Sequence, residues 1–180
     1  MKLTEIERLL PGIFQRVVEA GTPLFAILAV MEALQAPDEA VLEHLDAFFD
    51  PYRTPDAFVP FLAGWVDLEW LLREVPDEFV TLAPATFPSG SGRFRELIAA
   101  AAYLAQWHGT ARGLICFLET ATGVQGFTIE EQVIGPDGLP IPFHLRIHVP
   151  REVIPYQGMI ERIIEMEKPA YVTYELQVTQ

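Results

Sequence analysis

The segment HGTARGLICFLETATG, residues 108–123, marks the point at which the apolar pattern of the chain changes. Thr110 is a residue type that caps helix starts, and Leu114 and Leu118 follow it at helical spacing. Gly123 is a preferred stop for such a helix. Beyond Gly123 the apolar residues alternate with polar ones, which indicates strands. We therefore predict a helical region up to residue 123 and a different architecture after it.

On the N-terminal side of this segment, apolar residues recur at spacings of three and four. Thr22 followed by Pro23 is typical of a helix start, and Pro37 followed by Asp38 is typical of another. These signals predict two helices that meet near residues 35–37.

Two further helices are expected between this pair and Gly109. One covers residues 56–65, with an interruption at Pro60, and the other covers residues 93–107. Residues 75–92 hold three prolines and end in the run SGSG. This composition predicts an extended surface loop. The tight elbow at Gly109 and Thr110 then leads into the helix that ends at Gly123.

The last part of the chain alternates between strand and helix patterns. Strand-like alternation occurs at residues 127–129, 143–149 and 171–178, while residues 155–167 have helical spacing. We predict an α+β protein in which about five helices in residues 1–123 precede a small β-β-α-β domain in residues 124–180.

Composition and charge narrow the classes of partner. The 180 residues are 51% hydrophobic and carry a net charge of −13. Binding to nucleic acid or to anionic lipid requires clustered lysine and arginine, so neither partner is expected. The single cysteine, Cys116, excludes an intrachain disulfide. The charged N-terminus and the short apolar run at residues 23–31 predict neither a signal peptide nor a membrane anchor. Synthesis in the cytoplasm is expected.

Residues with catalytic or metal-binding chemistry are scattered. His144 and His148 lie on one face of a strand, about 13 Å apart if it is extended, which is too far for one metal ion. Cys116 lies in an apolar run and is interpreted as a small core residue, and His108 as a cap at a helix end. No nucleophile, phosphate-loop or metal motif occurs. We therefore predict no catalytic residue, no cofactor and no metal, and not an enzyme.

Aromatic side chains are the main alternative source of a binding site. They are Trp65, Trp70, Trp107, Phe48, Phe49, Phe58 and Phe61. At helical spacing such residues are more often core than ligand pocket. Part of this apolar surface is also consistent with an interface that closes on assembly.

Three ordered motifs resemble the phage tail protein I family. They are LPGIFQ at residues 10–15, FDPYRTPDAFVPFLAGW at residues 49–65, and residues 93–123, which include RELI, HGTARGL and LETATG. The run EKPAYVTYEL at residues 167–176 also resembles domains of baseplate wedge proteins. The loop at residues 75–92 is longer than the usual family pattern.

The resemblance implies a scaffolding subunit without catalysis. It implies a wedge component in the baseplate of a contractile tail or contractile injection particle, in a hetero-oligomer with a larger wedge subunit; hub and sheath proteins are further candidate partners. The alternatives are a module that binds a small ligand or peptide through the aromatic cluster and, third, an enzyme that uses His108, His144, His148 or Cys116.

The candidate interface and architectural residues form two groups. Those in the second motif are Phe48, Phe49, Asp50, Pro51 and Trp65, and those at the elbow are Gly109, Thr110, Arg112 and Gly113. Gly109 and Thr110 are expected to set the angle between two helices, because glycine adopts backbone conformations barred to other residues and threonine caps the next helix. Arg112 is expected to pair with a carboxylate, either within the chain or on a partner.

Overall fold

The computed structural model describes residues 3–72 and 87–179. Its contacts divide the chain into two compact units, Met1–Phe49 and Asp50–Gln180. The predicted boundary between residues 123 and 124 lies inside the second unit, so a separate domain from residue 124 onward stays a prediction. Residues 75–86 of the predicted loop lie outside the described residues.

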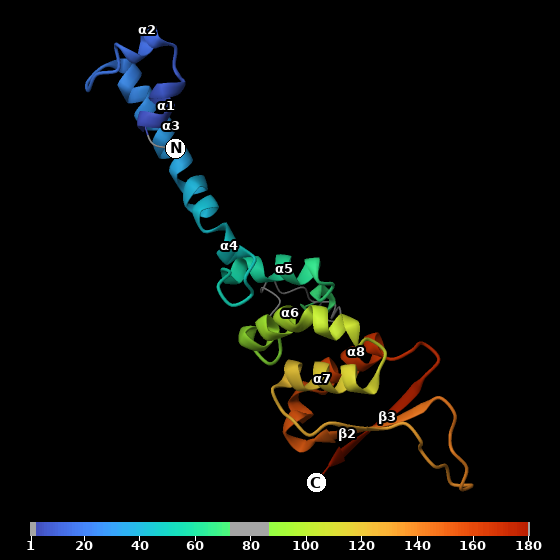
Figure 1. The fold of residues 1–180 in the computed structure, drawn as a ribbon. Helices are drawn as coiled ribbons and strands as arrows, with labels where there is room; N and C mark the ends of the chain where they lie inside the picture. The colour runs from blue at the N-terminus through green and yellow to red at the C-terminus, as the bar shows by residue number, and fades with distance from the viewer. Residues whose placement is uncertain (1–2, 73–86, 180) are drawn as a thin grey trace, which may run out of the picture. The chain divides into compact units, whose positions relative to one another are not determined.

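The first unit contains only helices in its described part: α1 (Leu3–Leu9), α2 (Gly12–Gln15), α3 (Pro23–Glu43) and α4 (Leu45–Phe48) (Figure 1). The Thr22 hydroxyl accepts a hydrogen bond from the Phe25 amide at 3.3 Å, as its capping signal predicts. Ile6 and Leu28 are the buried residues among those described in this unit. The unit therefore has very little core of its own.

The predicted break between two helices near residues 35–37 is wrong. Helix α3 continues through Pro37. Proline within a helix removes one amide hydrogen bond, and Pro37 has no amide hydrogen to donate to the Ala33 carbonyl. Alanine, leucine and glutamine precede it and alanine soon follows, and these residues favour the helix strongly enough to carry it across one missing bond.

The helices of the second unit follow the predicted order. The 3₁₀ turn Asp56–Phe58 leads into α5 (Val59–Trp65), so Pro60 lies in the first turn of α5, where its missing amide hydrogen costs little. Helices α6 (Ser91–Gln106) and α7 (Ala111–Thr122) pack against each other. Gly123 ends α7 in the left-handed conformation, with φ of 73°. A 3₁₀ segment, Glu69–Leu72, precedes the residues that are not described.

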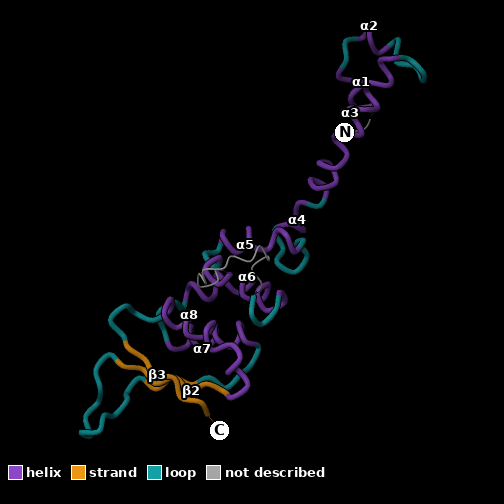
Figure 2. Tube along the Cα trace, turned by 180° about the vertical axis from the view of Figure 1, so that it is seen from behind, coloured by secondary structure: helices purple, strands orange, loops and turns teal. Residues whose placement is uncertain are grey.

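The C-terminal part has the predicted β-β-α-β order. Strands β1 (Thr128–Glu130), β2 (His144–Pro150) and β3 (Thr173–Thr179) form a sheet in the order β1-β2-β3. Figure 2 shows β2 and β3 side by side. β1 pairs with β2 antiparallel, and β2 pairs with β3 parallel. The parallel pair needs a crossover, which the 3₁₀ segment Arg151–Tyr156 and α8 (Gln157–Glu167) supply. The α+β class is confirmed.

One continuous core holds the second unit together. Leu97 and Ala101 of α6 and Phe117 of α7 are buried in it together with Ile147 of β2 and Ile163 of α8. Helices α7 and α8 therefore cover one face of the sheet, and the inward residues of the strands complete the core. Along each strand, the side chains that alternate with these inward residues point to the other face of the sheet and are mostly polar, as His144, Arg146 and His148 of β2 are.

The seven aromatic residues interpreted as core differ in exposure, and Phe48 and Trp107 are half-buried. Phe58 and Trp70 are half-buried and pack against the core. Phe49, Phe61 and Trp65 are 47%, 51% and 61% exposed, so the core interpretation is wrong for these three. Helical spacing shows which residues share a face but not whether another element covers that face.

Candidate interaction surfaces

The motif at residues 49–65 builds a turn as well as a surface. The Asp50 carboxylate accepts a hydrogen bond from the Tyr52 amide at 2.9 Å, and the Asp50 carbonyl accepts from the Thr54 amide at 2.9 Å. The Arg95 guanidinium donates to the Pro51 carbonyl and pairs with Asp56 at 2.6 Å. Asp50 and Pro51 thus belong to a turn that α6 holds in place. An interface role for Phe48, Phe49, Asp50, Pro51 and Trp65 stays a prediction.

A row of three aromatic rings runs from the 3₁₀ turn into α5: Phe58 is half-buried, whereas Phe61 and Trp65 are exposed. The centroids of Phe58 and Phe61 are 4.8 Å apart, and those of Phe61 and Trp65 are 5.2 Å apart. The two exposed rings, Phe61 and Trp65, give this side of α5 an aromatic surface, and aromatic side chains are enriched at protein interfaces.

The elbow between α6 and α7 has the geometry that its residue types predict. Gly109 has φ of 73°, and the Thr110 hydroxyl accepts a hydrogen bond from the Gly113 amide at 3.1 Å. The same hydroxyl donates to the Trp107 carbonyl at 2.7 Å, which ties the end of α6 to the start of α7. The angle between the two helices is therefore held by the chain itself.

Gly113 has a role that its sequence context did not reveal. A Cβ atom at this buried position would lie 2.1 Å from the Trp107 carbonyl oxygen. Only glycine permits this approach. Arg112 lies 4.6 Å from the centre of the Trp107 ring, and within the described residues it has no ion pair with a carboxylate. Its contact within the described residues is therefore a cation–π contact, and pairing with a carboxylate, within the chain or on a partner, stays a prediction.

His108 follows Trp107, the C-cap of α6, and its side chain contacts another helix. Its Nδ1 lies 2.9 Å from a carboxylate oxygen of Glu167, so it joins the end of α6 to the end of α8. Burial raises the pKa of Glu167, and the neighbouring His108 lowers it by a smaller amount. A cavity of about 360 Å³ lies beside this pair, and Asp67, Trp70 and Met166 help to line it. Cys116 is half-buried, and the contacts on the described residues do not bring it to His108.

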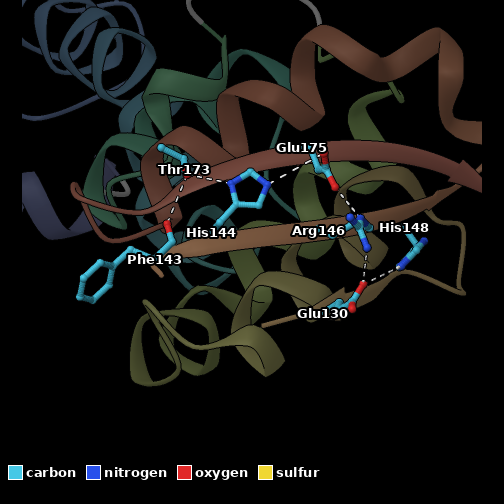
Figure 3. Close-up of polar contacts among 7 residues, drawn as sticks. All are labelled: Glu130, Phe143, His144, Arg146, His148, Thr173 and Glu175. Carbon is cyan, nitrogen blue, oxygen red and sulfur yellow. Dashed lines mark hydrogen bonds and ion pairs between the residues drawn. The ribbon is translucent and has the colours of Figure 1, made fainter. Parts of the chain in front are cut away.

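The outward face of the sheet carries a cross-strand network of charged groups (Figure 3). Arg146 on β2 lies between Glu130 on β1 and Glu175 on β3 and forms ion pairs with both, at 3.0 Å to Glu130. Because these two carboxylates accept its hydrogen bonds, the pKa of Arg146 rises above its ordinary value. Each strand contributes one member, so the network links all three.

The two histidines of β2 lie on opposite sides of Arg146. His144 Nδ1 is 2.8 Å from the Thr173 hydroxyl, and His148 Nε2 is 4.0 Å from Glu130 (Figure 3). They share a face, as predicted, but they have separate partners. No group of three or more metal-ligating side chains gathers in residues 3–72 and 87–179. None of the helices in the described part of the chain combines the length and the apolar character needed to cross a bilayer.

Comparison with known proteins identifies the family of this chain. Residues 19–171 match the model of a family described as phage tail protein (Tail_P2_I). The match covers most of the chain, so the protein belongs to this phage tail protein family, as the motifs predict; the match includes the motifs at residues 49–65 and 93–123. It is a structural tail component that interacts with other components of the tail. A comparison with curated proteins gives no match.

Proposed function

We propose that the protein is a structural baseplate wedge subunit, which packs its N-terminal helices against a larger wedge protein of a contractile tail or contractile injection particle. The proposal includes synthesis in the cytoplasm, incorporation into the baseplate and a role without catalysis. One observation carries it: most of the large apolar side chains in the described part of the first unit are exposed.

The exposed residues of α3 are large and numerous. Ile27 and Val30 are each 57% exposed, and Leu34 is 72% exposed. Leu28 is the buried residue of this 21-residue helix. A helix that is apolar on most sides is normally buried. Where a large apolar patch is exposed instead, it usually marks a site of association. Stable packing of α3 therefore calls for a protein surface that the chain does not itself supply in the first unit.

The second unit has the properties of a rigid support. Its core runs from α5 to the sheet, and the α6–α7 elbow and the Glu130–Arg146–Glu175 network hold its elements in fixed positions. A subunit that sets the geometry of a baseplate needs a rigid part of this kind as well as an adhesive part. The α5 aromatic row offers a second area for contact.

The experiment is deletion of the gene from its native cluster, followed by negative-stain electron microscopy of the particles. We expect missing baseplates, with loose tube or sheath material, because a wedge cannot close without one of its subunits. Intact particles that still contract would contradict the proposal and would favour a ligand-binding or enzymatic role.

Complementation of the deletion tests the N-terminal helix itself. Leu34→Glu places a charge on the exposed face of α3, and we expect it to reduce the number of assembled particles at least tenfold. Leu139→Glu makes the same change at a residue of the second unit that is 63% exposed, and we expect normal assembly. Equal assembly by both variants would mean that α3 is not the docking element.

A further inference from the structure

One line of exposed residues runs along α3 with a regular spacing. It consists of Ile27, Met31, Leu34, Asp38 and Val41, and we call it the α3 stripe. The intervals are four, three, four and three residues, which is the spacing of the residues that face a partner in a coiled coil. The four apolar members are 40% to 72% exposed.

Asp38 is the exception within the stripe. It is exposed, and its carboxylate has no hydrogen bond or ion pair within the described part of the chain. A carboxylate enclosed between two apolar helices loses its hydration, at a cost that only a well-placed cation or hydrogen-bond donor offsets. Such a polar position lowers affinity but fixes the register and the choice of partner.

The charges around the stripe select the kind of partner. Between residues 23 and 49 there is no lysine or arginine, whereas there are five acidic residues: Glu32, Asp38, Glu39, Glu43 and Asp46. A second copy of this segment would bring the same acidic charges, in either orientation, and no lysine or arginine for Asp38. A different protein with basic residues in its helix would supply the missing charge.

We propose that the α3 stripe receives an amphipathic helix of another tail protein, and that this helix carries a lysine or arginine opposite Asp38 within its own apolar stripe. The proposal rests on the function proposed above, because it takes α3 to be the docking element, and it adds the chemistry of the partner. Asp38 then sets the register in which the two helices pack.

The first test uses charge reversal in the deletion strain. Asp38→Lys would face a cation, so we expect at least a tenfold loss of assembled particles. Asp38→Asn keeps the shape and loses the charge, so a smaller loss is expected. Glu43→Lys makes the same change of charge on the opposite side of the same helix and should assemble within about twofold of wild type. Circular dichroism of each purified variant verifies that the helical content is unchanged.

The second test identifies the partner through suppressors of Asp38→Lys. We expect assembly to be restored by a change of lysine or arginine to aspartate or glutamate, within an apolar helical stripe encoded by another tail gene. Suppressors in the second unit of this chain would overturn the proposal, because they would mean that α3 folds against its own protein.

Two results separate this proposal from the wedge function. If deletion abolishes baseplates but Asp38→Lys assembles as well as Glu43→Lys, the partner chemistry is wrong and the wedge function stands. If deletion leaves intact particles, the function itself is wrong. Sedimentation of the purified protein gives a further outcome: a wild-type dimer that Leu34→Glu dissociates would make the occupant a second copy and overturn the proposal.

Discussion

At the scale of single residues, the most constrained position is Gly113. A Cβ atom there would lie 2.1 Å from the Trp107 carbonyl oxygen and 2.8 Å from the Trp107 carbonyl carbon. Both of these atoms belong to the backbone, so neither moves easily. We expect Gly113→Ala to lower the free energy of unfolding by about 1–3 kcal/mol, as overpacked sites do. Chemical denaturation of the purified protein measures this change.

The control for this prediction is another helical glycine. Gly158 of α8 is exposed, and a Cβ atom added to it would meet nothing within 4 Å. Gly158→Ala should leave stability unchanged or raise it by less than about 1 kcal/mol, because alanine favours a helix. Equal effects at both positions would mean that the close approach at Gly113 is relieved by movement of α6.

The raised pKa of Glu167 predicts that the stability of the protein depends on pH. Burial raises its pKa in the folded protein above the ordinary 4.5. The folded state then binds more protons than the unfolded state, so the contribution of Glu167 to stability is greatest below 4.5 and falls as the pH rises through the folded pKa. His108 and Asp67 are the other titratable groups at this cavity.

Glu167→Gln removes this dependence. As the pH rises from below 4.5 through the folded pKa of Glu167, we expect the stability of the variant to rise relative to that of wild type. Denaturant midpoints across this range measure the difference, and Glu152→Gln, at an exposed position of the same crossover, is the control. Parallel pH profiles for wild type and Glu167→Gln would contradict the prediction.

At the scale of elements, the elbow between α6 and α7 depends on the backbone of Gly109. Its φ of 73° is unfavourable for a β-branched residue, while the space around it is open. We expect Gly109→Val to cost roughly 1–2 kcal/mol of stability, and Gly109→Asn to cost less because asparagine tolerates this conformation. Thermal melts compare the two. Unchanged melting and unchanged particles with valine would refute the role of the elbow.

The charged network on the sheet needs side chains from all three strands. Strand β1 spans Thr128–Glu130, and Arg146 of β2 links its Glu130 to Glu175 of β3. The alternation of β2 predicts that His144, Arg146 and His148 share the outward face. It does not predict the carboxylates on either side, because those come from the pairing register of strands that are distant in the sequence.

At the scale of the whole molecule, the two units differ in how much core they contain. Ile6 and Leu28 are the buried residues of the first unit among those described, whereas the core of the second unit reaches from α5 to β2 and α8. Local stability follows buried contacts. We therefore expect amide hydrogens of α3 to exchange at least about tenfold faster than those of α7 in the isolated protein.

Hydrogen exchange measured by mass spectrometry tests this difference, peptide by peptide. The same measurement on assembled particles should show protection of α3, because docking would bury its exposed face. Equal protection of α3 and α7 in the isolated protein would mean that the first unit is stable without a partner, and would remove the main support for α3 as a docking helix.

The sequence by itself determined the features that depend on near neighbours. The starts of α3 and α7 at Thr22 and Thr110, the end of α7 at Gly123 and the β-β-α-β order all follow from caps, stops and periodicity within a few residues. The motifs also identified the family. These signals are local because helices and strands satisfy backbone hydrogen bonds according to short-range preferences.

Only the tertiary structure decided which faces are covered. Helical spacing placed Phe61 and Trp65 on one side of α5 but did not reveal that this side is exposed. The close approach at Gly113 and the ion pair between His108 and Glu167 also required the folded chain. The physical reason is that burial and contact depend on residues far away in the sequence, whereas a local pattern records only which side chains point the same way.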